Sequence, residues 1–435
     1  MKVSYTAQNG LCCSCGICKN LCNRDAITYK RHNGMYIPVI DENKCSNCGI
    51  CIKACPGASQ TYPEETDPRK AAEGQYIECF NAWSKDDNIR FISASGGFVT
   101  TLIMNLLKQK KYDAAFCVDS YSYDNQLCTQ VYKEQDFENP GKWQNTPKSR
   151  YLPVSHENLI SYIKTHKNER VIIVAIPCAT NGIVRAIEQL KLNRNNYLVI
   201  GLFCQKQFQY NFNEYVKSIA GGELQAFHFK NKESGNWPGN MKFLYADGRE
   251  KYMSSSCRTD AKDYFQMERC LYCIDKLAVH ADISVGDNYT HVASSPNGSN
   301  SVIIRTDIGL SAVEACQDFI EKVSVPFEKI SGAEALNERA KQYYWGLKKE
   351  EHLAENDYKT RINAGVVSED DYHDLSMYYT QLAKAEVGLS VNGEFSEYKK
   401  IISEVKKRRK KEKILCKIKT PLSIVKRKLK AVLKR

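Results

Sequence analysis

Cysteines at two fixed spacings open the chain. Both runs have the form C-x2-C-x2-C-x3-C, and they consist of Cys12, Cys15, Cys18 and Cys22, then Cys45, Cys48, Cys51 and Cys55. This is the spacing with which bacterial-type ferredoxins bind a pair of [4Fe–4S] cubanes. Three thiolates separated by two residues can ligate three corners of a cubane if the intervening backbone curls tightly around it. The two runs therefore predict that the protein transfers single electrons.

In two-cluster ferredoxins each run donates its last cysteine to the other cluster. We therefore expect one cluster on Cys12, Cys15, Cys18 and Cys55, and the other on Cys45, Cys48, Cys51 and Cys22. Pro56 follows the second run, whereas Asn23 stands at the matching place after the first, a change that affects loop rigidity without removing a ligand. Zinc or disulfides are the alternative for such C-x2-C pairs. The duplicated run with its proline favours clusters, and we expect Cys13 to be a bystander.

Four further cysteines lie far apart in the sequence, at Cys178, Cys204, Cys270 and Cys273. The first two follow the apolar segments 171–176 and 197–203, which we predict to be strands. Open α/β sheets place their sites at the carboxyl ends of such strands. Four thiols that converge there can bind a third [4Fe–4S] cluster or a tetrahedral zinc ion. The alternative is that some of them are ordinary buried core residues.

A turn of small residues, Ser93 to Gly97, leads into the strongly apolar segment 98–107. Backbone N–H groups at a helix N-terminus attract phosphate, so the pyrophosphate of a flavin would fit there. A plain serine-capped helix start is the alternative. The chain has no G-x-G-x-x-G after a strand and no Walker A run, so neither a Rossmann nor an ATP site is indicated. No Ser/His/Asp arrangement can be argued, and the catalytic residues are not identified.

An α/β core is needed to position these residues. Residues 1–62 form the cysteine module, with strands at 26–29 and 35–39 around the Asn33-Gly34 turn, and 63–78 is a polar linker. Within 79–330, predicted strands alternate with predicted helices, which indicates an α/β core with a mixed sheet. The expected strands are 82–92, 112–118, 171–176 and 197–203, and the expected helices are 98–107, 157–166, 183–190 and 210–219. Short strands follow at 224–252 with an Asp247-Gly248 hairpin, and 331–398 is expected to be a helical cap.

Composition points to a cytoplasmic protein. The N-terminal residues have no basic segment followed by an apolar one, so the 19 cysteines are expected to stay reduced. The apolar stretches at 171–176 and 198–203 are far shorter than the roughly 20 residues of a membrane span.

The net charge of +12 comes from the C-terminal tail, residues 399–435. This segment holds 17 Lys or Arg and 2 acids, so the remaining 398 residues have a net charge of −3. The body is therefore not expected to bind nucleic acid. Apolar residues interleaved with the basic ones predict amphipathic helices on an anionic membrane surface, which would place the protein at the inner membrane face. A solvated tail and nucleic-acid contact by the tail are the alternatives.

The order of motifs resembles a known family. After the cysteine runs come SASGGFVT, IPCATNGIVR, GLFCQKQF and RCLYCIDKLAVHADISVGD, in the order found in the family of coenzyme F420 hydrogenase/dehydrogenase beta subunits. The resemblance covers roughly residues 1–330. It implies a core [4Fe–4S] cluster on Cys178, Cys204, Cys270 and Cys273, with Cys257 as a nearby substitute. It also implies FAD held by Ser93, Ser95, Gly96, Gly97 and Thr100, with Asp282, Gly286 and Asp287 near the flavin.

These cofactors imply an FAD- and [4Fe–4S]-dependent oxidoreductase. Electrons would pass from a redox partner protein through the module clusters, the core cluster and FAD to a two-electron acceptor, or in reverse. The acceptor is F420 or another organic substrate, and relatives among surface-polysaccharide biosynthesis proteins add a second context. An electron-transfer subunit without its own substrate site and a scaffold that keeps clusters for stability are the competing hypotheses.

Overall fold

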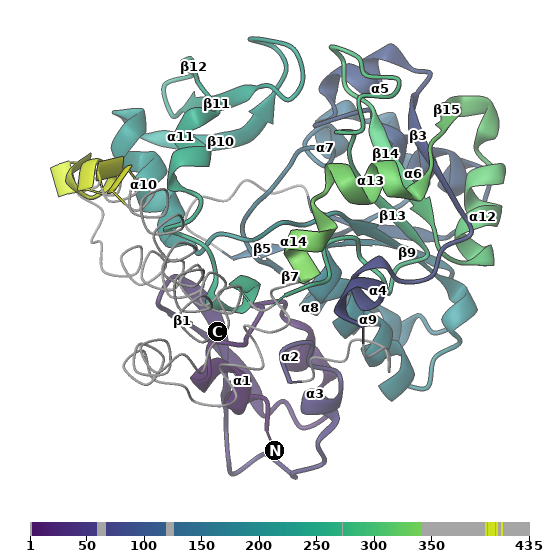
Figure 1. Cartoon of the computed structure of the whole chain (residues 1–435). Helices are drawn as coiled ribbons and strands as arrows, with labels where there is room; N and C mark the ends of the chain where they lie inside the picture. The colour runs from purple at the N-terminus through teal and green to yellow at the C-terminus, as the bar shows by residue number, and fades with distance from the viewer. Residues whose placement is uncertain are drawn as a thin grey trace, which may run out of the picture.

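The computed structural model describes residues 2–58, 67–118, 126–271, 273–340 and parts of a helical segment within 396–411. Three parts are visible in Figure 1: the N-terminal cysteine module, a large α/β core and a small antiparallel sheet. The module lies against one side of the core.

The module contains a β-hairpin and three short helices. Strands β1 (Ile27–His32) and β2 (Met35–Ile40) pair antiparallel, with Ile27 opposite Ile40 and His32 opposite Met35. Asn33 and Gly34 turn the chain with φ angles of 48° and 67°, the two positive values that a type I′ hairpin turn requires. The predicted turn is confirmed. The helices are α1 (Ser4–Gln8), α2 (Ile17–Leu21) and α3 (Ile50–Lys53).

Both cysteine runs have the same backbone curl. In the first, Ser14 and Gly16 have φ angles of 52° and 73°; in the second, Asn47 and Gly49 have φ angles of 57° and 75°. Each left-handed pair flanks the second cysteine of its run, and α2 or α3 begins directly after it. The sequence repeat is thus also a conformational repeat.

The core contains an eight-stranded mixed sheet. Its strands β4, β8, β9 and β13 are parallel in the centre, and antiparallel strands flank them on both sides. The strand order is β15-β3-β14-β13-β9-β8-β4-β6. The bounds are β3 Glu78–Ser84, β4 Ala114–Cys117, β6 Gln130–Tyr132, β8 Val171–Ala175, β9 Tyr197–Leu202, β13 Ile283–Asp287, β14 Asn300–Ile304 and β15 Ile320–Ser324. The predicted mixed α/β class is confirmed.

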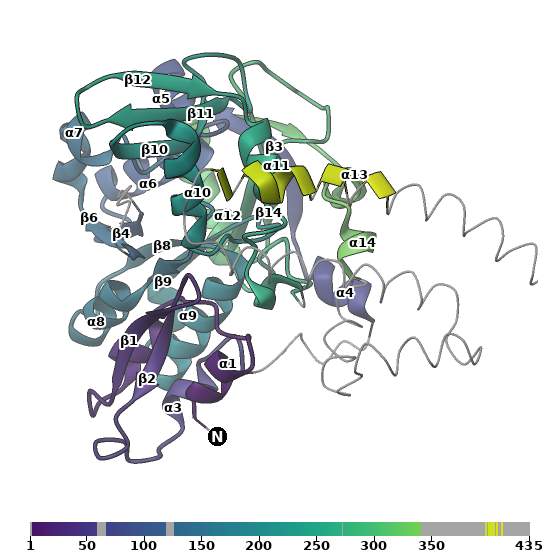
Figure 2. The ribbon, with the colours of Figure 1, turned by 90° about the vertical axis from the view of Figure 1, so that its left-hand side faces the viewer.

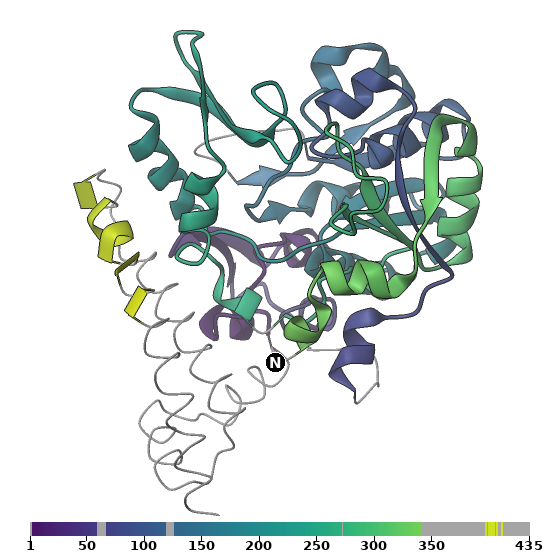
Figure 3. The same cartoon turned by 45° about the horizontal axis from the view of Figure 1, so that its top comes forward.

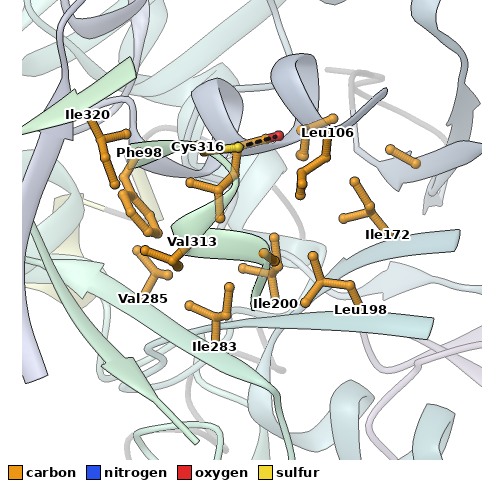
Figure 4. Packing of buried hydrophobic residues seen from close by; sticks show 14 of the residues in the cluster. Phe98, Leu106, Ile172, Leu198, Ile200, Ile283, Val285, Val313, Cys316 and Ile320 are labelled. Carbon is orange, nitrogen blue, oxygen red and sulfur yellow. Dashed lines mark hydrogen bonds between the residues drawn. The ribbon is translucent and has the colours of Figure 1, made fainter. Parts of the chain in front are cut away.

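Helices cover both faces of this sheet. Because side chains alternate along a strand, Ile172, Leu198 and Ile200 face one side, where α6 (Phe98–Lys108) and α12 (Asp307–Glu314) pack on them (Figure 4). Val171, Ile173 and Val199 face the other side, under α8 (Glu157–Thr165) and α9 (Pro177–Gln189). The module packs on this second helix layer through α2 and α3 (Figure 1), and Figure 2 shows the module below α8 and α9.

The small sheet consists of β10 (Leu224–Asn231), β11 (Asn240–Tyr245) and β12 (Glu250–Met253), all antiparallel. Gly248 turns the predicted hairpin between β11 and β12 with a φ of 84°. Helices α10 (Asn211–Ala220) and α11 (Ser256–Ala261) share an aromatic core with this sheet. Figure 3 shows it standing beside the core as a separate lobe.

The strand predicted at 82–92 is wrong over most of its length. β3 ends at Ser84, and helix α5 (Asp87–Ile92) follows. The Asp86 carboxylate accepts a hydrogen bond of 3.0 Å from the Ile89 N–H, so an N-cap begins a helix there. α9 also begins six residues before the predicted start, because Pro177 is well suited to the first helical position.

The C-terminal part is described in pieces. Within the expected linker lies α4 (Pro68–Glu73), which contacts α14 (Leu336–Ala340); α13 (Phe327–Ala333) precedes α14. The rest of the predicted cap, 341–395, and residues 412–435 of the tail lie outside the described residues. Ile401 and Ile402 pack against the small-sheet core, and Lys406 forms an ion pair of 3.4 Å with Asp260. None of the described helices is both long enough and apolar enough to span a membrane.

Candidate functional site

A cavity of about 290 Å³ lies at the carboxyl ends of the central parallel strands. Its wall includes the ends of β4, β8, β9 and β13 and the start of α6 and α9. Many of the predicted site residues line it, namely Cys178, Cys204, Ser93, Ser95, Gly97, Thr100, Gly286 and Asp287, together with Cys13 and Cys15 from the module. Residues predicted from five separate motifs therefore meet around one space.

The Ser93–Gly97 turn is fixed by its packing on β14. Gly97 has a φ of 79°, and a Cβ on Gly96 would lie 2.8 Å from the Ser299 Cα and 2.9 Å from the Ala82 oxygen. Both glycines are therefore required by the backbone. Gly96 does not line the cavity; it sets the depth at which the turn sits. α6 begins directly after Gly97, which has no side chain that could cap the helix. Its first turn, 98–100, borders the cavity.

The serine hydroxyls of the turn are already used as donors. The Ser93 Oγ donates to the Ile89 oxygen at 2.6 Å, and the Ser95 Oγ donates to the Ser299 oxygen at 2.7 Å. The hydrogens of both hydroxyls are therefore already donated within the protein. They hold the turn in shape, and Lys232 adds to this by donating to the Ser95 oxygen at 3.0 Å.

Asp287 and Gly286 end β13 at the cavity wall. The Asp287 carboxylate pairs with Lys230 of β10, and this buried ion pair joins the large sheet to the small one. Burial by itself would lower the pKa of Lys230, but the adjacent Asp287 carboxylate raises it above the ordinary value. A Cβ on Gly286 would overlap the Phe203 ring, so the glycine permits close packing of β9 and β13.

Asp282 does not belong to the cavity. It lies before the amino end of β13, fully buried, and its carboxylate accepts hydrogen bonds from Arg194 at 2.9 and 3.0 Å. The Val199 N–H and the Thr306 hydroxyl donate to it as well, at 2.8 and 2.7 Å. These partners use its acceptor capacity, so its role is structural. Its predicted place near the flavin rests on the family resemblance alone.

Four thiols, called here the core thiols, lie close enough to shift one another's pKa values. They are Cys178, Cys204, Cys270 and Cys273. Burial raises the pKa of Cys204, and Cys270 and Cys273 raise it further; burial likewise raises that of Cys270 to about 11. The substitute considered from sequence, Cys257, lies on α11 in the small-sheet lobe, near Asp260 and Lys406. Within the described residues, no three His, Cys, Asp or Glu side chains are arranged to hold a single metal ion. A cubane, in contrast, spreads its four thiolates over its corners.

The module thiols fall into two groups that differ in exposure. Cys12, Cys18 and Cys55, with Cys15, are the inner thiols, and the first three are at most 9% exposed. Cys22, Cys45, Cys48 and Cys51 are the outer thiols, of which Cys48 is exposed and the others partly so. Burial and then Cys55 raise the pKa of Cys12, whereas the Ile50 N–H lowers that of Cys48. Cys22 acts on Cys51, and both Cys55 and Cys51 act on Cys18, so the crosswise assignment stays a prediction.

Cys13 connects the inner thiols with the core thiols. It is 4% exposed and shares a hydrogen bond with Cys178, which lowers the pKa of Cys13 to about 7 and raises that of Cys178. The contact depends on close packing between module and core. The Cys15 oxygen accepts a hydrogen bond of 2.8 Å from the His156 N–H, and Gly182 of α9 leaves room for Ile17. Cys13 therefore lies between the two groups of thiols, and its expected role as a bystander rather than a ligand stays a prediction.

Cationic side chains on the cavity wall were not predicted from the sequence. They are Lys148, Arg150, Lys206 and Lys230, against one lining acid in the described residues, Asp287. Burial lowers the pKa of Lys206, although Asp263 pairs with it at 2.9 Å. Burial also lowers the pKa of Lys148 to about 8. The sequence pattern that could have indicated them is the run KSRY at 148–151, which lies outside every predicted helix and strand.

Comparison with known families decides the relationship. The family model for the carboxyl-terminal part of the coenzyme F420 hydrogenase/dehydrogenase beta subunit matches residues 168–326, and the model for its amino-terminal part matches residues 79–160. The chain belongs to this family of F420 hydrogenase/dehydrogenase beta subunits. A 4Fe-4S binding domain matches residues 38–58, which contain the second cysteine run. The predicted family and a 4Fe-4S binding segment at the second cysteine run are therefore confirmed, and the segments matched by the two beta-subunit models meet at the cavity.

Two relatives of this member of the F420 hydrogenase/dehydrogenase family are informative. One of the subunits of the F(420)H(2) dehydrogenase of Methanosarcina mazei is 24% identical over 330 residues, which are 75% of this chain and 88% of the relative. A chain from the F420-reducing [NiFe] hydrogenase complex of Methanosarcina barkeri aligns with a TM-score of 0.47 and 19% identity, over 65% of this chain and 95% of that one. The proteins named in these comparisons are oxidoreductase subunits.

Proposed function

We propose that this chain is a flavin-dependent iron–sulfur oxidoreductase that exchanges electrons with a protein partner at the outer thiols and with a two-electron acceptor at the cavity. The observation that carries the proposal is the shared cavity. Its wall combines two core thiols, two module thiols and the turn at Ser93–Gly97. A relay protein without a substrate site has no need for such a space.

The residues present fit the proposed cofactors. Two left-handed residues in each run make the tight curl that a cubane requires, which supports a cluster on both the inner and the outer thiols. The core thiols supply four sulfur donors of the kind that hold [4Fe–4S] clusters. The excess of positive charge on the cavity wall suits the diphosphate of FAD. When bound, clusters exchange single electrons, and FAD pairs two of them for delivery as hydride.

The chain's own residues would orient the ligand and exclude water. Phe98, Val99 and Ile103 of α6 and Leu202 and Phe203 at the end of β9 make the apolar part of the wall. A dry cavity strengthens every electrostatic interaction inside it. The Lys230–Asp287 pair joins the two sheets across this wall and places a fixed charge pair beside the ligand. The glycines of the Ser93–Gly97 turn let the turn pack closely on its neighbours beside the cavity, so the start of α6 is held in place there.

The proposal names the acceptor only by its chemical class, a two-electron acceptor. The name of the Methanosarcina mazei relative includes F420, so a deazaflavin is the first acceptor to test. An organic substrate of surface-polysaccharide synthesis is the second. That relative is one of several subunits of its enzyme, which also supports a protein partner for this chain.

The test is reduction of bound FAD by a reduced ferredoxin, a one-electron donor too large to enter the cavity. Anaerobic stopped-flow spectroscopy would follow flavin bleaching in the wild type, in Cys204→Ala and in the control Cys316→Ala, which removes a buried thiol elsewhere in the core. We expect fast reduction in the wild type and the control, and loss of the fast phase in Cys204→Ala. Failure of the wild type to bind any flavin would leave the electron-transfer subunit as the better account.

A further inference from the structure

A strap of six residues, 145–150, closes one side of the cavity and is held by its own arginine. The Arg150 guanidinium donates to the Asn145 oxygen at 2.5 Å, the Lys148 oxygen at 2.8 Å and the Thr146 oxygen at 3.3 Å. These three bonds span the whole strap. Its backbone is therefore preorganised, and the Lys148 side chain leaves it from a defined point.

The strap is joined to the Ser93–Gly97 turn. The Ala94 N–H donates to the Pro147 oxygen at 2.7 Å, directly before Lys148. Lys232 reaches the same turn from the end of β10 and donates to three backbone oxygens, those of Arg90, Ser95 and Asn297, at 2.5, 3.0 and 2.8 Å. Turn and strap thus form one rigid corner of the cavity.

The cationic side chains on the cavity wall differ in whether they have a partner within the protein. Lys206 is paired with Asp263, Lys230 with Asp287, and Arg150 with the strap backbone. The Lys148 ammonium makes no hydrogen bond or ion pair with any other described residue, although its backbone oxygen accepts from Arg150. The Glu233 carboxylate raises the pKa of Lys148, but it already accepts hydrogen bonds from Lys242 at 2.5 Å and from the Tyr252 hydroxyl at 2.6 Å. A half-buried ammonium without a partner costs free energy that a bound anion would recover.

We propose that Lys148 binds a phosphate group of the ligand in this cavity. The assignment rests on the proposed function for the cavity and adds a specific residue to it. The phosphate can belong to FAD or to the acceptor, and both sources share the same chemistry. Lys148 provides a charge-assisted hydrogen bond, and the rigid strap lowers the entropy cost of making it.

The test is a comparison of ligand affinities in Lys148→Met, measured anaerobically on the full chain by fluorescence titration with FAD, riboflavin and inorganic pyrophosphate as a competitor. We expect Lys148→Met to weaken FAD binding about 10- to 100-fold, the loss typical of one charge-assisted hydrogen bond, and to leave riboflavin binding unchanged. Lys148→Arg should recover most of the FAD affinity. Lys167→Met, which removes an exposed lysine, is the matched control.

The possible outcomes distinguish the assignment of Lys148 from the proposed function of the cavity. If FAD affinity is unchanged but pyrophosphate binding to the FAD-loaded protein is lost in Lys148→Met, the phosphate belongs to the acceptor. If the wild type binds pyrophosphate through Lys148 but takes up no flavin, the anion site stands while the proposed function fails. Equal FAD and pyrophosphate affinities in wild type and Lys148→Met would overturn the assignment.

Stability gives an independent readout. The Lys148 ammonium has no described partner, and the charges of Arg150 and Lys242 repel it. Replacing it with the uncharged methionine should therefore leave the unfolding temperature unchanged or raise it slightly. A structural lysine would show the reverse. A Lys148→Met protein that melts lower and loses riboflavin as well as FAD would contradict the proposal.

Discussion

The inner and outer thiols come from the same sequence motif and the same backbone curl, but they differ in their surroundings. Cys18 is 7% exposed and lies in the module core, whereas Cys48 is exposed to solvent. The difference arises because α2 of the first run packs against α8 and α9, whereas α3 of the second run contacts α9 and leaves Cys48 in solvent. A repeated motif can therefore supply two chemically distinct sites: one that a partner protein can approach, and one insulated beside the cavity.

The largest expected effect is the loss of one ligand from each group. Cys18→Ala and Cys48→Ala should each reduce bound iron by about four atoms. Cys18→Ala should also lower the free energy of unfolding by several kcal/mol, because Cys18 lies in the module core, the proposed cluster would bind there, and metal binding contributes to folding. Cys48→Ala should unfold close to the wild-type temperature. Equal destabilisation of the two variants, measured by anaerobic thermal denaturation, would remove the distinction between inner and outer.

The next effect concerns thiol reactivity in protein freed of iron. The thiolate is the reactive form, burial raises the pKa of Cys18, and the Ile50 N–H lowers that of Cys48. We expect iodoacetamide at pH 7.5 to label Cys48 at least about 100-fold faster, since two pKa units correspond to a factor of about 100 in thiolate. Peptide mass spectrometry would measure both rates. Comparable rates would mean that the inner thiols are open to solvent without their cluster.

The same pKa shifts set the sign of a pH dependence. A thiol must lose its proton to bind iron, and a raised pKa means that the proton is held to higher pH. Reconstitution of the inner cluster should therefore improve between pH 7 and 9 more than reconstitution of the outer one. Iron uptake by Cys48→Ala, which keeps the inner site, and by Cys18→Ala, which keeps the outer site, would compare them. A steeper pH dependence in Cys18→Ala would contradict the assignment.

A smaller and sharper comparison uses the two repeat glycines. Gly16 and Gly49 have nearly the same φ, but a Cβ on Gly16 would lie 2.0 Å from the Ser155 Oγ, whereas nothing lies within 4 Å of one on Gly49. Gly49→Ala should cost about 1–2 kcal/mol of stability from left-handed strain. Gly16→Ala should cost more, because the added methyl also pushes the module from the core. If adding Ser155→Gly to Gly16→Ala recovers none of the difference, the clash is not the cause.

The smallest expected effect belongs to Cys13→Ala. If Cys13 assists Cys178 without being a ligand, the variant should keep the wild-type iron content. In the cluster-bound protein Cys178 has no proton, so Cys13 would be the donor of their hydrogen bond, and its removal should lower the reduction potential of the core cluster. Redox titration followed by electron paramagnetic resonance would show the shift. Loss of about four iron atoms would make Cys13 a ligand instead.

The sequence predicted best where function or turn chemistry depends on neighbouring residues. The cysteine spacing and the Asn33-Gly34 turn are local patterns, and the structure confirms the turn and repeats the same curl in both runs. The strand predicted beyond Ser84 failed for a local reason as well, because the Asp86 N-cap signal was overlooked.

Other features depend on residues that meet across the fold. The sequence does not indicate that Arg194 and Thr306, which are distant in sequence, hold the Asp282 carboxylate. Lys148 carries no signal until the bond from Ala94 to Pro147 places the strap on the cavity. Helix and strand patterns do not encode such long-range pairings, so the charge of the cavity could not be predicted from the sequence.

The most direct test of the central claim is the iron, sulfide and flavin content of protein purified without oxygen. Three cubanes account for about 12 iron and 12 sulfide per chain, and two account for about 8. We predict about 12 iron, about 12 sulfide and one FAD. About 8 iron with no flavin, after an attempt at FAD reconstitution, would contradict the account and leave a two-cluster electron carrier.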